Sequence, residues 1–243
     1  MKPSVILRIL PLTAAALALG ACGSLIPVGN DGSGERADSR TRTTPQPRRI
    51  ATAPQSIAPR PSDAACLTDL SKTGARFTAL PDAYAGPGCT KLGTVQLASL
   101  AGDGSQFSVS NIGPVQCRVA STFSNWARFG VDRAAREILG SPLARIETMG
   151  SYACRNVAGS NRRSAHASAE AIDVSGFVLE DGRRITLTAD WNGGTAAERE
   201  FLRVVHRSAC RRFGTVLGPE YNRAHADHFH LEGTAGSGRN FCR

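Results

Sequence analysis

The sequence predicts a single α+β domain in which helices flank a central antiparallel sheet, preceded by an export signal and a tether. Three observations predict this organisation. From residue 63 to residue 243, apolar residues recur with helical spacing in some segments and alternate in others. In the second half, a hairpin pattern is followed by one long helix and then by short strands, which is typical of antiparallel α+β domains. Residues 23–62, by contrast, contain few large apolar side chains.

The first 21 residues form an expected signal peptide. Lys2 and Arg8 precede a short apolar run, which ends in Leu-Gly-Ala before Cys22. The run is too short to span a bilayer comfortably. Its end resembles a bacterial lipobox, which implies that Cys22 becomes the lipidated first residue of the mature chain. Gly23, by resemblance to lipoproteins of diderm bacteria, favours the outer membrane, facing the periplasm. The alternative is an ordinary signal peptide in which Cys22 is incidental.

Residues 22–62 are expected to form a disordered tether, because their Gly, Ser, Thr, Pro and Arg content leaves too little apolar surface to bury. The formal net charge of the chain is +9. In an exported protein this charge favours an anionic membrane surface or wall polymer as partner, and no block of Lys and Arg indicates nucleic acid binding. Solubility alone would also explain the charge.

Cysteine usage agrees with export. The sequence has 7 cysteines, and those that remain after Cys22 can form disulfides in an oxidising compartment: Cys66, Cys89, Cys117, Cys154, Cys210 and Cys242. The sequence does not select a pairing, although Cys66 with Cys89 is a plausible local pair. No Cys-x-x-Cys motif occurs, which argues against a thiolate zinc site.

Expected helices come from apolar spacing and from capping signals. A short helix covers 66–73 and ends at Gly74. In 117–129, residues 119, 123 and 126 are apolar at positions i, i+4 and i+7. A second helix, 132–139, stops at Gly140 and Pro142. Thr195 and Glu198 form a capping box that begins a helix running to residue 213.

Expected strands alternate or lie next to turn signals. Residues 92–98 and 143–149 have strand patterns. The segments 171–179 and 183–188 flank Glu-Asp-Gly, a hairpin signal with Gly182 at the turn. Residues 215–218 and 228–232 are short closing strands. Between the hairpin and the last helix, Trp191 is expected to lie in a Gly-rich loop.

Four of the 5 histidines fall in two short segments. The first segment runs from Ser164 through His166 to Asp173, and the second contains His225, Asp227, His228 and His230. A catalytic zinc ion needs three nitrogen or oxygen ligands and one open position. Asp173 interrupts an apolar strand pattern, where an unpaired carboxylate would be costly. Residues 228 and 230 would face the same side of a strand. The pattern predicts a metal site; a structural polar cluster is the alternative.

These segments resemble the LAS metallopeptidases, the superfamily of murein endopeptidases and D-Ala-D-Ala peptidases. That family binds zinc through the His and Asp of Ser-x-His-x6-Asp and the last His of His-x-His, which correspond to His166, Asp173 and His230. The run at 225, 228 and 230 is similar to the penicillin-insensitive murein endopeptidase branch, whose non-ligand histidines line the site. Residues 64–243 also resemble the bacterial extensin-like C-terminal domain family. The matching features include Tyr-x-Cys-Arg at 152–155, Val-Leu-Gly-Pro-x-Tyr-Asn at 216–222 and His-x-Asp-His-Phe-His at 225–230.

The resemblance implies a disulfide-braced fold of the LAS or hedgehog type and a lipid-anchored zinc peptidase that hydrolyses an amide bond in peptidoglycan or its peptide fragments. His228 is expected to be the general base or to stabilise the transition state, with His225 and Asp227 as alternatives. Arg155 is expected to hold a substrate carboxylate or the oxyanion, with a surface charge beside Cys154 as the alternative. Ser164 is expected to bind substrate near the site, and the alternative is that it ends a loop. Two positions depart from the family pattern. Ala169 replaces a common Gly, and Asp227 stands where other branches have a catalytic Glu.

Two other functions remain open from the sequence. A lipoprotein could bind the cell wall without catalysis and keep zinc for structure, because fold is inherited more readily than chemistry. A module could instead bind polyanions through its basic surface, in which case salt and not a chelator would abolish binding.

Overall fold

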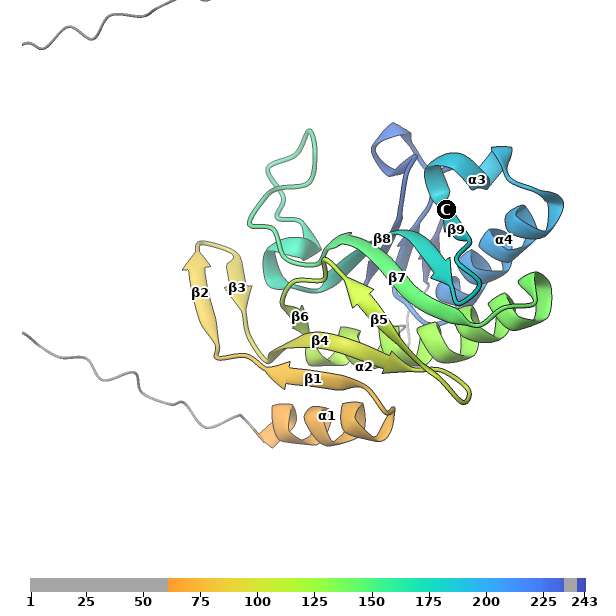
Figure 1. Ribbon diagram of the computed structural model, residues 1–243. Helices are drawn as coiled ribbons and strands as arrows, with labels where there is room; N and C mark the ends of the chain where they lie inside the picture. Colours follow the sequence, from red (N-terminus) through yellow and green to blue (C-terminus); the bar gives the residue numbers. More distant parts are fainter. Residues whose placement is uncertain (1–60, 234–239) are drawn as a thin grey trace, which may run out of the picture. The chain divides into compact units, whose positions relative to one another are not determined.

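The computed structural model describes residues 61–233 and 240–243. The expected signal peptide, the expected lipid attachment site Cys22 and the expected tether as far as residue 60 lie outside the described residues. Among the helices of the described segments, none is long and apolar enough to cross a membrane. The described segments form a mixed α+β domain with a central sheet and helices, as expected (Figure 1).

The central sheet has ten strands, eight of them in the order β1-β4-β5-β7-β8-β11-β10-β12, with β6 paired to β4 and β9 paired to β8. Its strands are β1 (Arg76–Ala79), β4 (Thr94–Ala101), β5 (Gln106–Ser110), β6 (Val115–Gln116), β7 (Leu143–Gly150), β8 (Ala171–Leu179), β9 (Arg184–Thr186), β10 (Thr215–Leu217), β11 (Phe229–Glu232) and β12 (Phe241–Cys242). A separate hairpin consists of β2 (Ala83–Gly86) and β3 (Cys89–Lys91).

The expectation of an antiparallel sheet is wrong at two places. Strand β5 pairs with β7 in parallel, and β10 pairs with β12 in parallel. The first parallel pair has a physical reason, because the long helical segment that connects β5 to β7 returns the chain to the end of the sheet from which it started. The other pairs of the sheet are antiparallel, including the expected β8–β9 hairpin, whose turn residue Gly182 has φ +88°.

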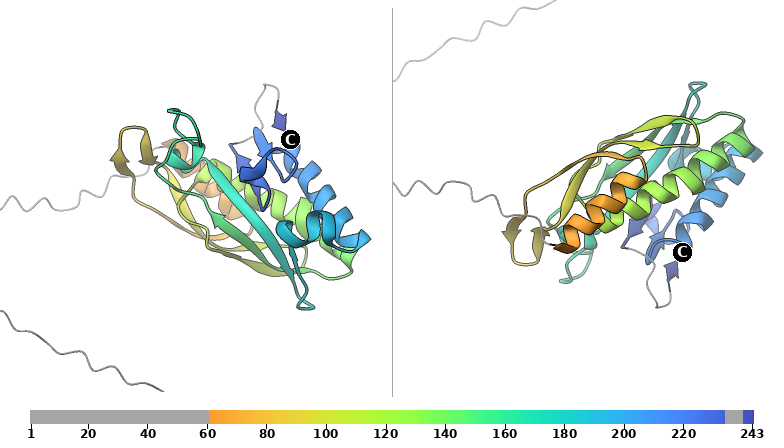
Figure 2. Two further views of the ribbon diagram at one scale, coloured as in Figure 1. Left: turned by 90° about the horizontal axis from the view of Figure 1, so that it is seen from above. Right: turned by 90° about the horizontal axis from the view of Figure 1, so that it is seen from below.

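The helices are α1 (Pro61–Lys72), α2 (Cys117–Trp126), α3 (Leu187–Gly193) and α4 (Ala196–Cys210), with short helical turns η3 (Ala165–Ser168) and η4 (Arg223–His225). Helix α1 packs alongside α2, and both lie on one face of the sheet (Figure 2). The capping box of Thr195 and Glu198 at the start of α4 is confirmed. Helix α3 was not expected: Trp191 lies in this helix and is buried.

The expected helices 117–129 and 132–139 are one continuous helix. After α2 the helix continues through two π-helical segments, η1 (Ala127–Asp132) and η2 (Ala135–Leu139). The helix ends at Gly140, whose φ is +71°. Gly130 in η1 lies so close to Ser208 of α4 that a Cβ atom would collide with its hydroxyl. The helix is therefore wider than an α-helix where it contacts α4.

The core lies between the sheet and the helices. Trp126 of α2 is fully buried, and its ring contacts Phe123, Phe177 and Phe213 at centroid distances of 5.5, 6.3 and 6.2 Å. The first two of these contacts are tilted, and the third is edge-to-face, which is one of the arrangements that aromatic pairs prefer. The aromatic residues come from α2, β8 and the segment after α4, so this cluster joins the first helix layer to the strand that carries Asp173.

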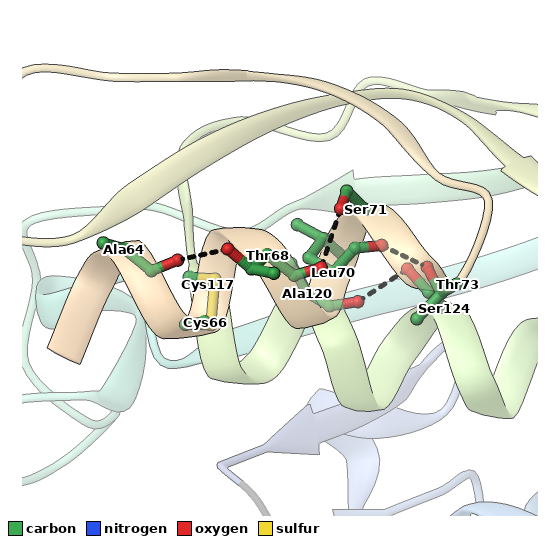
Figure 3. Close-up of a disulfide and its surroundings, with 9 residues drawn as sticks. All are labelled: Ala64, Cys66, Thr68, Leu70, Ser71, Thr73, Cys117, Ala120 and Ser124. Carbon is green, nitrogen blue, oxygen red and sulfur yellow. Dashed lines mark hydrogen bonds between the residues drawn. A yellow bond between two sulfur atoms is a disulfide. The ribbon is translucent and has the colours of Figure 1, made fainter. Parts of the chain in front are cut away.

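Three disulfides pair the six cysteines of the described residues: Cys66–Cys117, Cys89–Cys154 and Cys210–Cys242. The local pair Cys66–Cys89 was therefore wrong. Cys66 lies on α1 and joins the first residue of α2 instead, which fixes these adjacent helices to each other (Figure 3). Each bridge joins segments that are distant in sequence, with separations of 51, 65 and 32 residues. Nearness in sequence is thus a poor guide to pairing here.

Candidate metal centre

Strand pairing places Asp173 opposite His230. Strands β8 and β11 are antiparallel neighbours, and the Cα partner of His230 is Asp173. Side chains alternate along β11, so Phe229 and Leu231 are buried in the hydrophobic core while His230 faces the other side. The two residues are 57 positions apart in the chain, and the sheet register brings their side chains together.

His166 reaches the same point from a short helical turn. It lies in η3, directly before β8, and its backbone N–H donates to Ser164 Oγ at 3.4 Å. The turn ends at Ala169, which adopts the left-handed conformation with φ +58°. This conformation favours glycine, which gives a physical reason for the glycine that the LAS metallopeptidases often have at the position resembling Ala169. Ser164 therefore caps the turn that carries His166, and it also lines the cleft described below.

Three side-chain groups converge. His166 Nε2 lies 3.1 Å from Asp173 Oδ2 and 3.2 Å from His230 Nδ1, and His230 Nδ1 lies 2.9 Å from Asp173 Oδ1. All three residues are buried. Among the described residues, these three form one of two groups whose ligand atoms are close enough to hold a metal ion. The three residues that the sequence selected as ligands are therefore together.

Hydrogen bonds on the outer side of each ring fix how the two imidazoles point. His166 Nδ1 lies 3.0 Å from the backbone oxygen of Ser151, and His230 Nε2 lies 3.2 Å from Glu232 Oε2. Because both partners are acceptors, each ring can place a proton on its outer nitrogen, and its inner nitrogen (His166 Nε2, His230 Nδ1) faces Asp173, where it can donate when protonated or bind a metal ion when neutral. Glu232 was not selected from the sequence. Glu232 lies two residues after His230 on the same strand, and this spacing could have identified it as a hydrogen-bond partner of His230.

The electrostatics of the centre call for a cation. Burial raises the pKa of Asp173, but hydrogen bonds from His166 and His230 lower it by more. The net pKa is below the usual value of an aspartate, and the carboxyl stays ionised. Burial lowers the pKa of His230, whereas hydrogen bonds to Asp173 and Glu232 raise it, to about 9. In the protein without metal, a proton on His230 thus supplies the positive charge that the carboxylates attract. A metal ion would supply it in place of that proton.

The donor set fits zinc. Metal–ligand distances of about 2.0–2.1 Å in a tetrahedral site put the ligand atoms about 3.3 Å apart, and the atoms here are 2.9–3.2 Å apart. Two imidazoles and one carboxylate are ligands of catalytic zinc sites, and the outer contacts of both rings are of the kind that orients such ligands. The residues present therefore fit a zinc ion held by His166, Asp173 and His230.

The second group of possible ligands does not fit a metal. It consists of His206, Cys210 and Cys242, but the two sulfur atoms are joined in a disulfide. The ring of His206 packs instead between aromatic side chains, 5.9 Å from Trp191 and 5.2 Å from Phe229 between centroids. Burial lowers the pKa of His206, so this imidazole is neutral at pH 7.

A cleft of about 470 Å³ lies over the centre. One part of its lining comes from the loop between β7 and η3 and from the start of η3, and the other comes from β10, β11, β12 and the segment between β10 and β11. The lining includes Arg155, Arg162, His225, His228, His230 and Glu232. Arg155 and Ser164, which the sequence selected for substrate binding, therefore border the same cleft as the histidines.

The remaining histidines surround His230. His228 is buried, its Nδ1 lies 2.8 Å from Asp227 Oδ1, and its Nε2 lies 3.5 Å from Asp173 Oδ1. The His225 ring is 5.2 Å from that of His228 and 5.8 Å from that of His230 between centroids. The Nδ1 atom of His225 lies 2.8 Å from Asn222 Oδ1. Burial has the largest effect on the pKa of His225 and the neighbouring imidazoles add to it, so that this pKa is lowered to about 4.

Comparison with known proteins gives one match. No curated protein and no solved structure matches the chain. The family model described as extensin-like protein C-terminus matches residues 64–243. This range contains all the described strands, the three disulfides and the converging histidines. The chain therefore belongs to the extensin-like protein C-terminus family.

Proposed function

We propose that this protein is an exported, lipid-anchored zinc peptidase that hydrolyses an amide bond in peptidoglycan peptides. One observation carries the proposal: His166, Asp173 and His230 converge within 2.9–3.2 Å beneath a cleft that two further histidines line. The proposal includes a relation to the LAS metallopeptidases. The Ser-x-His-x6-Asp and His-x-His motifs supply both the converging residues and their neighbours in the cleft.

His166, Asp173 and His230 would hold the zinc ion. When bound, zinc supplies a Lewis acid that polarises the amide carbonyl and makes a water molecule acidic enough to attack at neutral pH. Burial of the three side chains keeps the centre in a low-dielectric environment, in which charge–charge interactions are stronger than in water. The cleft above gives an extended peptide access to the centre.

His228 is the residue that we assign to proton transfer. Its Nδ1–H donates to Asp227 Oδ1 at 2.8 Å, which leaves the lone pair of Nε2 facing the centre, 3.5 Å from Asp173 Oδ1. From there Nε2 would accept a proton from the attacking water and later donate it to the leaving amine. Asp227 would then orient His228 rather than act as the base. This role agrees with the replacement of the usual Glu by a shorter side chain.

An open ligand position distinguishes a catalytic site from a structural one. His225 is the histidine best placed in the sequence to close the site as a fourth ligand. However, its Nδ1 lies 2.8 Å from Asn222 Oδ1, and it is not among the atoms that converge. This arrangement supports catalysis over a purely structural metal, and it leaves neutral His225 beside the substrate as a hydrogen-bonding group.

Digestion of purified peptidoglycan by the zinc-loaded protein tests the proposal. The products, separated by chromatography and identified by mass spectrometry, should contain new amine and carboxyl termini at one type of amide bond. His230→Ala should bind no zinc and release nothing. His228→Gln should keep zinc and lose most of the activity. Hydrolysis by a zinc-free preparation would refute the role of zinc, and no hydrolysis by the zinc-loaded protein would refute the peptidase. Release of Cys22→Ser from the membrane fraction would support the lipid anchor.

A further inference from the structure

The loop between β7 and η3 forms one wall of the cleft and has a defined backbone. Asn156 and Arg163 pair as an antiparallel bridge, Val157 N–H donates to Arg162 O at 2.9 Å, and Ser164 N–H donates to Arg155 O at 3.1 Å. The disulfide Cys89–Cys154 ties the start of this loop to β3. The loop is therefore a braced hairpin, and the side chains that it carries start from fixed positions.

The three arginines of this hairpin have different surroundings. Arg163 stabilises the loop, because its Nε donates to Pro87 O and its Nη1 donates to Asn156 Oδ1, each at 3.0 Å. Arg155 and Arg162 make no side-chain hydrogen bond or ion pair within residues 61–233 and 240–243, and both line the cleft. Each guanidinium offers five N–H donors in a planar fork, a geometry that matches a carboxylate.

The charge of the cleft is not balanced by its own lining. Among the described residues that line the cleft, Glu232 is the one carboxylate, and it accepts from His230. Both guanidiniums line the cleft together with His225, His228 and His230. Such a cleft attracts anions.

We infer that Arg155 and Arg162 form a carboxylate-binding wall, and that the cleft takes anionic peptides with a free carboxylate close to the amide that is cleaved. The inference rests on the proposed function for the peptide, and it adds Arg162 as a specificity-determining residue. A peptide without carboxylates leaves both guanidiniums without partners and gains little from this wall. A peptide with free carboxylates accepts charge-assisted, bidentate hydrogen bonds from these guanidiniums.

The test uses the zinc-loaded full chain and a matched pair of synthetic peptides. One is a stem tetrapeptide with free carboxylates, and the other is the same peptide with every carboxylate converted to an amide. Binding of each is measured by calorimetry, and hydrolysis of each is followed by chromatography. The variants are Arg162→Gln and Arg162→Lys. The control is Arg118→Gln, an exposed arginine that lines a different hollow and tests for the loss of one positive charge alone.

The wild-type protein should bind the free-carboxylate peptide at least about tenfold more tightly than its amide twin. Arg162→Gln should bind the free-carboxylate peptide about tenfold more weakly and the amide peptide as tightly as the wild type does. Arg162→Lys should lose less affinity for the free-carboxylate peptide than Arg162→Gln, because lysine keeps the positive charge but lacks the planar guanidinium. Arg118→Gln should bind both peptides as the wild type does. Equal affinity for the two peptides, an equal loss for both in Arg162→Gln, or no binding of either overturns the carboxylate wall. If both peptides are hydrolysed and bound equally well, the carboxylate-binding wall is wrong and the proposed peptidase stands. If the free-carboxylate peptide is bound more tightly but neither peptide is hydrolysed, the wall stands and the proposed peptidase is wrong.

Discussion

Glu232→Ala tests whether the outer hydrogen bond of His230 prepares the centre for zinc. In the structure, Glu232 Oε2 lies 3.2 Å from His230 Nε2 and keeps the Nδ1 atom of this ring directed at Asp173. Removal of the carboxylate leaves the proton of His230 free to sit on either nitrogen and the ring free to turn. We therefore expect weaker zinc binding without loss of the fold, because Glu232 lies at the end of β11 and is not part of the core.

The size of the effect follows from exposure. A hydrogen bond to a charged group contributes about 1.5–3 kcal/mol when its surroundings are dry. The Glu232 side chain is 38% exposed, so we take the low end of that range. A loss of about 1.4 kcal/mol corresponds to a tenfold weaker zinc affinity, which agrees with the effects of outer-shell partners in other metal sites. Glu232→Gln keeps a neutral hydrogen bond and should lose only about threefold.

Competition with a chromophoric chelator measures the zinc affinity of each variant. Urea unfolding of the zinc-free proteins checks that the fold is intact. The matched control is Glu180→Gln, an exposed carboxylate at the β8–β9 turn away from the cleft, which should bind zinc as the wild type does. If Glu232→Ala binds zinc as tightly as the wild type, the outer hydrogen bond does not prepare His230, and the account of the site in terms of fixed ring orientation is wrong.

Three further predictions concern stability. The pKa of His230 in the metal-free protein is raised from 6.5 to about 9, so its contribution is complete below pH 6.5 and is lost as pH rises through 9. Urea unfolding of the metal-free protein should therefore show a free energy of unfolding that falls by up to about 3 kcal/mol as pH rises from 6.5 through 9, and His230→Gln should remove this dependence. Replacing Cys89 and Cys154 by Ser opens a link across 65 residues. This should lower the free energy of unfolding by about 4 kcal/mol, and an unchanged urea midpoint would contradict it. Trp126→Ala, at a fully buried position, should cost about 3–5 kcal/mol in the same assay, and a cost below that of a surface substitution would argue against the aromatic cluster.

Much of the element pattern could be predicted because it depends on local signals. The apolar spacing of Val119, Phe123 and Trp126 placed α2, and the capping box at Thr195 placed α4. Local signals do not predict features of the fold that depend on contacts between distant segments. Gly130 contacts Ser208 of α4, and β5 pairs in parallel with β7 across a long connection, so both features involve segments that are distant in the chain. The sequence offers no local sign of either.

The ligand set could be predicted from residue types and spacing, but its geometry required the sheet. Asp173 stood out because a carboxylate in an apolar strand needs a partner. Its position opposite His230 follows from the β8–β11 register, which no local pattern specifies. Glu232 and Arg162 were missed because a single Glu or Arg is common on a surface. Only the hydrogen bond to His230 and the lining of the cleft distinguish these two residues.

X-ray absorption at the zinc edge of the loaded protein, with elemental analysis, tests the central claim most directly. The account predicts one zinc ion per chain, a first shell of two imidazoles with oxygen ligands and no sulfur, and loss of the bound zinc in Asp173→Ala. A shell of three or four imidazoles would place His225 or His228 on the metal and close the site. A wild-type protein that retains no zinc would contradict the metal centre altogether.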